Sequence, residues 1–184
     1  MICIQHFAKW VELIALPDKS SKSAAHALLT HVLSRFGAPG EIITDQGAEF
    51  EGAFTDLLVG HRVNHRTAAR EHPQSDGLAE RMVQTMKLSL RKILLKEHRT
   101  DWDIFLPYVA MGYRMKKQAS TGYSPYCLLY GRHPIFQAQI QAAEHDPLPE
   151  ALKELPKFIL ERSKLFEEVM PLAMRNLAIA QQRD

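Results

Sequence analysis

Two acidic residues, Asp45 and Glu80, lie where the sequence predicts the ends of secondary-structure elements. Asp45 follows Ile42 and Ile43, two β-branched residues typical of a strand that is covered on both faces. Because ligands of open α/β sheets gather at the carboxyl ends of strands, Asp45 is placed where a site would form. Glu80 lies 35 positions later, in the predicted first turn of a helix that begins at Leu78. The two carboxylates could therefore serve one site, although the helix dipole alone also favours an acid in a first turn.

The helix predicted to carry Glu80 is also basic. Gln84, Lys87 and Arg91 follow Glu80 at spacings of four, three and four residues, so all four side chains share one face. The opposite stripe is apolar and is expected to meet the core; it consists of Met82, Met86, Leu90, Ile93 and Leu94. A carboxylate and two cations on one face suit an anionic backbone held beside a metal ion. A solvated basic face with no ligand is the alternative interpretation.

The sequence around both acids resembles a known family, the integrase catalytic core of gypsy-type LTR retrotransposons. The second-aspartate motif of that family is similar to Thr44-Asp45-Gln46-Gly47 with Phe50. Its glutamate motif is similar to His72-Pro73-Gln74-Ser75 with Gly77 and Glu80-Arg81. The motifs come in the family's order and at its usual separation. Phe7-Ala8-Lys9-Trp10 and the run from Ser120 to Pro125 extend the resemblance over roughly residues 1–135.

The resemblance implies a fold and a chemistry. The fold is α/β and ribonuclease H-like, a mixed sheet flanked by helices. The chemistry is metal-dependent polynucleotidyl transfer, in which three carboxylates hold two Mg²⁺ or Mn²⁺ ions about 4 Å apart, and the ions activate the nucleophile and stabilise the leaving oxygen. Asp45 and Glu80 match the second and third carboxylates. The residues expected to contact DNA are Gln74, Ser75, Gln84, Lys87 and Arg91.

The first catalytic aspartate of the family lies on an earlier strand at the centre of the sheet. No carboxylate precedes Glu12 in this sequence, and Asp18 follows Pro17 in a polar turn typical of a loop or helix cap. The sequence therefore predicts an incomplete triad and a sheet that lacks its central strand. Without that strand, backbone groups stay unpaired, or the strand before Asp45 pairs directly with the amino-terminal hairpin. We expect weak metal binding and negligible strand transfer from the 184 residues alone.

Two functions remain open. The chain is either an integrase core that is catalytic only when completed by upstream sequence, or a catalytically silent remnant of a retrotransposon that binds nucleic acid or protein. The resemblance implies DNA as the partner and the nucleus as the location, with the cytoplasm as the alternative. The sequence leaves open the host, the target-site preference and the oligomeric state.

Composition bounds these possibilities. A hydrophobic content of 46% with 24% charged residues is typical of a soluble globular protein. No apolar run is long enough to span a bilayer. Two cysteines, Cys3 and Cys127, make no disulfide framework, so we expect a reducing compartment. Nine scattered histidines without a cysteine pair predict no zinc-binding module. The net charge of +2 is too small to indicate nucleic acid by itself.

We expect three segments: a core-like domain at 1–134, a linker at 135–149 and a helical extension at 150–184. The core should contain a helix at 18–37, with Phe36 among its apolar positions, and another at 101–117, with Trp102 on its buried side. The extension is expected to be interrupted by Pro156 and Pro171. Its apolar stripe has no obvious partner in the chain, which makes a partner helix or a homodimer a reasonable hypothesis.

Overall fold

The computed structural model describes residues 1–67, 73–98, 100–134 and 155–182, except for the side chains of 73–81, 97, 155–162 and 165. The chain forms two compact units. The first unit comprises Met1–Ile4 and Glu12–Ala110, and the second comprises Gln5–Val11 and Met111–Asp184. Of the helices described, none has both the length and the apolar character needed to cross a membrane. The linker predicted at 135–149 lies outside the described residues, so the proposed domain boundaries stay a prediction.

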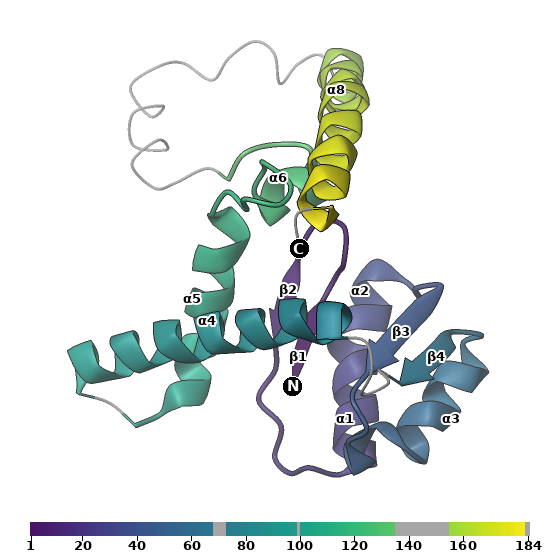
Figure 1. Cartoon of the computed structure of the whole chain (residues 1–184), viewed down its shortest axis with the longest axis vertical. Helices are drawn as coiled ribbons and strands as arrows, with labels where there is room; N and C mark the ends of the chain where they lie inside the picture. Colours follow the sequence, from purple (N-terminus) through teal and green to yellow (C-terminus); the bar gives the residue numbers. More distant parts are fainter. Residues whose placement is uncertain (68–72, 99, 135–154, 183–184) are drawn as a thin grey trace. The chain divides into compact units, whose positions relative to one another are not determined.

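In the described residues, four short strands form two separate pairs (Figure 1). Strands β1 (Ile2–Ile4) and β2 (Val11–Leu13) make the expected amino-terminal hairpin. Strands β3 (Glu41–Thr44) and β4 (Asn64–Thr67) run parallel to each other. Within the described ranges no strand joins the two pairs. The β3 strand therefore does not pair with the hairpin, and its second edge has no strand partner there.

The burial of β3 differs from the sequence-based expectation. Ile42 packs against the core, but Ile43 is 54% exposed, so the prediction of a strand covered on both faces is wrong. Successive side chains of a strand point to opposite faces. Only the face that carries Ile42 and Thr44 meets the rest of the first unit. The other face is open.

The core of the first unit lies between β3 and its nearest helices. Helix α1 (Ser21–Leu28) is capped by Ser20, whose hydroxyl oxygen accepts a hydrogen bond from the Ser23 amide at 3.2 Å. It continues through a π-helical turn (Leu29–Leu33) into α2 (Ser34–Phe36). A 3₁₀ helix (Ala48–Phe50) and α3 (Ala53–Gly60) follow β3. The buried residues of this core are Ala24, Leu28, Leu33, Phe54, Leu58 and Val63.

The π-helical turn explains why one predicted core position is wrong. A π turn takes in one more residue than an α turn, so the positions after it are rotated relative to the regular helical spacing. As a result Leu33 is buried, whereas Phe36, which the spacing placed in the core, is 41% exposed.

Helices α4 (Pro73–Glu97) and α5 (Trp102–Met115) complete the first unit and begin the second. The sequence predicted that α4 begins at Leu78, but it begins at Pro73, a residue that suits the first position of a helix. Glu80 is therefore the eighth residue of α4 and not part of its first turn, which removes the helix-dipole explanation for an acid there. Met82 and Met86 are buried, as the apolar stripe predicted.

Helix α5 differs from prediction at its first residue. Val109 and Ala110 are buried, but Trp102, expected on the buried side, is 46% exposed. The prediction failed because Trp102 lies at the helix end, where helical spacing says little about what covers a side chain.

The second unit is built on helices α6 (Pro125–Tyr130) and α8 (Leu155–Gln181). Contrary to expectation, Pro171 does not interrupt α8. Pro156 is the second residue of the helix, where a backbone N–H has no intrahelical partner to lose. Around Pro171, the lost hydrogen bond is offset by packing, because Val169 and Ala173 are both buried in a cluster with Ala8 and Leu128.

The described part of the apolar stripe of α8 thus has a partner within the chain, which the sequence did not predict. Met170 packs on the same cluster, and the Phe166 ring reaches Gly131 at the end of α6. The amide of Asn176 also donates a hydrogen bond to the carbonyl oxygen of Thr121 at 3.0 Å. No second subunit is needed to bury these residues.

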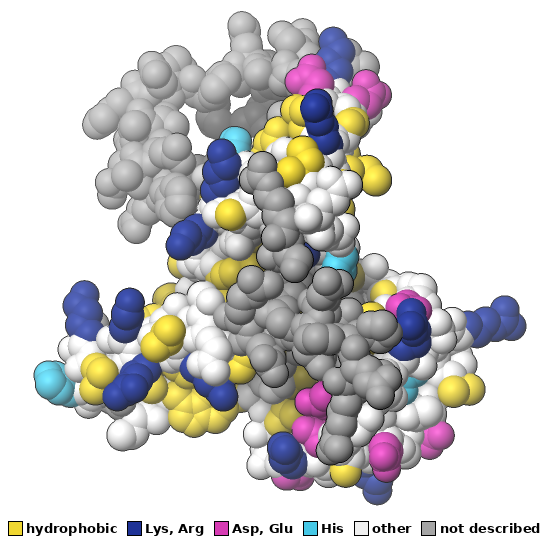
Figure 2. Space-filling model, viewed as in Figure 1, with side chains coloured by type: hydrophobic (Ala, Val, Ile, Leu, Met, Phe, Trp, Pro, Cys, Tyr) yellow, Lys and Arg dark blue, Asp and Glu magenta, His cyan; other side chains and the backbone are white. Residues whose placement is uncertain are grey.

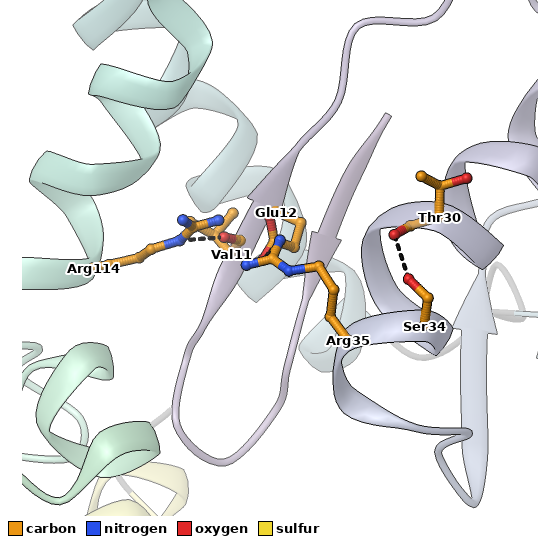
Figure 3. A network of polar contacts seen from close by, with 6 residues as sticks. All are labelled: Val11, Glu12, Thr30, Ser34, Arg35 and Arg114. Atoms are coloured by element: carbon orange, nitrogen blue, oxygen red, sulfur yellow. Dashed lines mark hydrogen bonds and ion pairs between the residues drawn. The ribbon is translucent and has the colours of Figure 1, made fainter.

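Polar contacts tie the hairpin to its neighbours (Figure 3). Within the second unit, Arg114 Nε donates to the carbonyl oxygen of Val11 at 2.8 Å, and its guanidinium lies 4.3 Å from the ring centroid of Trp10. Within the first unit, Arg35 pairs with the buried carboxylate of Glu12 at 3.1 Å. Figure 3 also shows the Ser34 hydroxyl donating to the carbonyl oxygen of Thr30. The side chains of Arg114 and Arg35 thus contact β2, the first through the Val11 carbonyl and the second through the Glu12 carboxylate.

Replacing Gly131 with alanine should destabilise the second unit. Gly131 ends α6 in the left-handed conformation, at φ 62°, and an added Cβ would collide with the Phe166 ring. The backbone conformation alone costs a non-glycine residue about 1–2 kcal/mol. Gly112→Ala is the matched control, because Gly112 lies within α5 with open space around it and should gain roughly 0.5–1 kcal/mol. Urea unfolding measures both, and equal stability of Gly131→Ala and wild type would contradict the packing of α8 on α6.

Candidate metal and nucleic-acid site

Asp45 directly follows β3 and is exposed. Its Oδ1 atom accepts a hydrogen bond from the Gly47 amide at 3.1 Å, which closes a tight turn. The residue before it, Thr44, is buried, and its hydroxyl lies 2.9 Å from Nε2 of His65 on β4. The His65 ring in turn packs edge-on against Phe54, with centroids 5.9 Å apart. The start of the turn is thus anchored in the core, while the carboxylate faces solvent.

A second carboxylate that the sequence analysis missed lies near Asp45. Glu49, in the 3₁₀ helix, approaches Gly47 so closely that a Cβ there would be 2.6 Å from Glu49 Oε2 and 3.0 Å from Asp45 Oδ1. Lys19 lies 3.6 Å from the other Glu49 oxygen. The four-residue spacing between Asp45 and Glu49 is the signal that could have found it, but only with the turn at Gly47 known.

The other predicted site residues lie on α4. Glu80, Gln74 and Ser75 belong to this helix, but their side chains lie outside the described part, so their distances from Asp45 stay a prediction. Gln84, Lys87 and Arg91 are all exposed, as expected for one solvent-facing stripe. In the part of the chain whose side chains are described, no group of three or more His, Cys, Asp or Glu residues could hold a metal ion.

The basic character of α4 is clear on the surface. Lys92 and Lys96 are exposed together with Lys87 and Arg91, and no acidic residue occurs between positions 82 and 96. Figure 2 shows Lys and Arg side chains gathered around the carboxyl-terminal part of α4, with apolar side chains among them. Between positions 82 and 96, therefore, the helix carries no acid that would repel a bound anion.

Comparisons with known proteins bear on the family and the fold of the chain. No family model matches the chain. The Pol polyprotein of Drosophila melanogaster transposon 412 is 29% identical over 133 residues, which are 72% of this chain and 10% of the relative. The Gag-Pol polyprotein of Woolly monkey sarcoma virus is 30% identical over 135 residues, 73% of this chain and 8% of the relative. The chain thus spans about a tenth of the length of these relatives.

Solved structures show the same fold. The simian T-cell lymphotropic virus intasome, in complex with PP2A regulatory subunit B56 gamma, matches with a TM-score of 0.64 and 21% identity, over 74% of this chain and 50% of that one. The HTLV-2 integrase catalytic core in complex with magnesium matches with a TM-score of 0.58 and 21% identity, over 68% and 80%. The chain belongs to the retroviral integrase superfamily. The ribonuclease H-like fold expected from the sequence is thereby confirmed.

The first unit also contains a large cavity, which is partly open. A cavity of about 520 Å³ is bordered by the hairpin, α1, the 3₁₀ helix after β3, α4 and α5. Most of its lining is apolar, and its polar lining residues are Asp18, Lys19, Glu49 and Lys87. Hydrogen bonds from Ser20 lower the pKa of Asp18 to about 2, in keeping with its predicted role as a loop or cap residue. Protein cores hold few voids larger than a water molecule, so a cavity of this size is exceptional. Its volume is large enough to take further side chains.

Replacing Thr44 with valine should show how much the contact to His65 contributes. Valine keeps the shape of the side chain but removes the buried hydroxyl, so we expect a loss of about 1 kcal/mol in the free energy of unfolding. Thr67→Val is the matched control, because Thr67 pairs with Thr44 in β4 and is exposed. Urea unfolding of both variants measures the difference. If the two variants are equally stable, the hydrogen bond does not anchor the turn before Asp45.

Proposed function

We propose that the chain contributes two of three carboxylates to a metal-dependent DNA strand-transfer site, and that it acts only when an added strand supplies the third. Asp45 and Glu80 are the two carboxylates present. The 184 residues alone are then an incomplete enzyme with weak metal binding and negligible activity. The dimeric and trimeric forms named for HTLV-2 integrase cores favour self-association of this chain as well.

The observation that carries this proposal is the unpaired edge of β3, in a unit that also contains an apolar cavity. In the described part of the chain, β3 pairs on one edge only and presents the half-exposed Ile43 on its open face. An unpaired strand edge carries free N–H and C=O groups and is a template for another strand. The cavity offers apolar surface for the side chains of such a strand. An added strand would satisfy both the backbone of β3 and the apolar lining.

The residues present suit a hard divalent cation. Asp45 is exposed, and only its Oδ1 atom has a described hydrogen bond, from Gly47. Mg²⁺ prefers oxygen ligands and is commonly held by one or two carboxylates with waters and phosphate oxygens. When bound, the metal would activate the attacking oxygen and stabilise the leaving one. In this proposal, Asp45 and Glu80 hold the ion, and Lys87 and Arg91 hold the DNA backbone.

The second candidate function is a catalytically silent DNA-binding module. The exposed cations of α4 favour it, because phosphate contacts require positive charge and accessibility but no metal ligand. The two functions differ in what they require. The enzyme needs Asp45 and Glu80, whereas the binding module tolerates Asp45→Asn and fails when Lys87 and Arg91 are both replaced by alanine.

Manganese should raise the melting temperature of the chain only at high concentration. A ligand at ten times its dissociation constant stabilises the folded state by about 1.4 kcal/mol. We expect Asp45→Asn and Glu80→Gln each to abolish the response, because each removes a ligand. Asp56→Asn is the control, since Asp56 is exposed on α3 and should leave the response unchanged. Circular dichroism melts with and without Mn²⁺ make the measurement, and a response that survives Asp45→Asn would refute the metal site.

Strand completion can be tested with a synthetic peptide of about six residues, the usual length of a strand. In the peptide, apolar residues alternate with polar ones, and one aspartate lies near the carboxyl end. We expect this peptide and its asparagine counterpart to raise the melting temperature equally, because both fill the cavity and pair with β3. Only the aspartate peptide should support Mn²⁺-dependent transfer of a DNA 3′ end.

Two controls make this test decisive. A peptide with proline at its centre cannot donate the ladder hydrogen bond there and should not stabilise the chain. Asp45→Asn should abolish transfer by the completed chain without changing the effect of the peptide on stability. Transfer with the asparagine peptide, or no stabilisation by either strand, would contradict the proposal.

A further inference from the structure

A groove of about 370 Å³ lies between α4 and the start of α5, within the first unit. It is lined by Lys87, Leu90, Arg91, Leu94, Leu95 and Trp102. The lining combines two exposed cations, three leucines and one large aromatic side chain. No carboxylate is among the lining residues that the structure describes.

Trp102 is the distinctive feature of this groove. Its side chain is 46% exposed, although tryptophan is strongly buried on average. The other tryptophan, Trp10, is 6% exposed and packs edge-on against Tyr130 with centroids 5.6 Å apart. Trp102 therefore presents a planar apolar surface in the same groove as Lys87 and Arg91. Unlike Trp10, it is not buried in the core.

The cations and the aromatic side chain suit different parts of one ligand. Lys87 and Arg91 are four residues apart, which places them about 6 Å apart along the helix axis. Two positive charges at this spacing suit a chain of phosphates, and the indole suits a flat ring. A fatty acid would satisfy the leucines and one cation, but it would make no use of the flat indole surface or of a second charge.

We infer that this groove binds an unpaired nucleotide of DNA, with its base stacked on Trp102 and its phosphates held by Lys87 and Arg91. The inference rests on the proposed DNA binding by α4 and specifies which form of DNA the site prefers. Stacking of a base on an aromatic side chain contributes about 1–3 kcal/mol and depends little on the sequence. A base paired in a duplex is not available for such stacking. The site should thus favour single-stranded over double-stranded DNA.

Acidic residues near Trp102 do not oppose this assignment. Asp101 and Asp103 flank Trp102 in the chain, but neither lines the groove. Both lie at the start of α5, where the helix dipole favours negative charge.

The experiment uses the full chain and two labelled oligonucleotides, a short oligo-thymidine strand and a duplex of the same length. Fluorescence anisotropy measures their affinities, and quenching of tryptophan emission reports contact with the indole. We expect the single strand to bind more tightly and to quench the emission. Trp102→Leu should weaken single-strand binding about tenfold, abolish the quenching and leave duplex binding unchanged within twofold. Trp102→Phe should retain most of the affinity.

Two further variants separate stacking from charge. Tyr108→Leu is the matched control, because Tyr108 is 61% exposed on the same helix but does not line the groove, and it should change neither affinity. The double change of Lys87 and Arg91 to alanine should weaken both DNA forms, because it removes phosphate contacts. Melting curves establish that each variant is folded.

The outcomes distinguish this inference from the function on which it rests. Equal affinity for both DNA forms, with no effect of Trp102→Leu, would overturn the inference and leave DNA binding by α4 intact. Absence of binding to either form would overturn both. A second copy of the chain in the groove would appear as self-association that Trp102→Leu abolishes, without quenching by DNA, and this too would overturn the inference.

Discussion

The structure depends above all on the need of backbone N–H and C=O groups for partners. In the described part of the first unit this need is met by helices, by residues of the amino-terminal hairpin and by one parallel pair of strands, and β3 has no described strand on its other edge. Ile43, which is exposed, belongs to this strand, and Asp45 directly follows it. An exposed strand edge with apolar β-branched residues is a template for pairing with another strand.

Features set by local chemistry could be predicted from the sequence. Ser20 and Ser124 cap their helices through their own side chains, and Gly131 ends α6 because it accepts the left-handed conformation. The amino-terminal hairpin closes at Gln5, whose amide donates to the Trp10 carbonyl at 2.8 Å and whose side-chain oxygen accepts from the Ala8 amide. In each case the residue type and its immediate neighbours determine the outcome, so no distant contact was needed.

Features that depend on distant contacts could not be predicted in this way. The burial of Leu33 in place of Phe36 depends on a π-helical turn that no spacing rule signals. The continuity of α8 through Pro171 depends on packing against Ala8, which is more than 150 positions away in the chain. The approach of Glu49 to Asp45 depends on the path of the chain at Gly47. The site residues themselves were predictable only by type and order, because their mutual distances are a property of the assembled sheet.

In the proposed site, the position of Asp45 would link completion of the fold to the chemistry. A carboxylate that holds a catalytic metal must be fixed to within about 0.5 Å, which requires support from well-packed neighbours. The described support for Asp45 comes from its own turn at Gly47 and, through Thr44, from His65 on β4. His65 lies on the strand that pairs with β3, and Gly47 lies within the turn itself. A strand on the open edge would therefore do more than add a third carboxylate, since it would also restrain the strand end from which Asp45 projects.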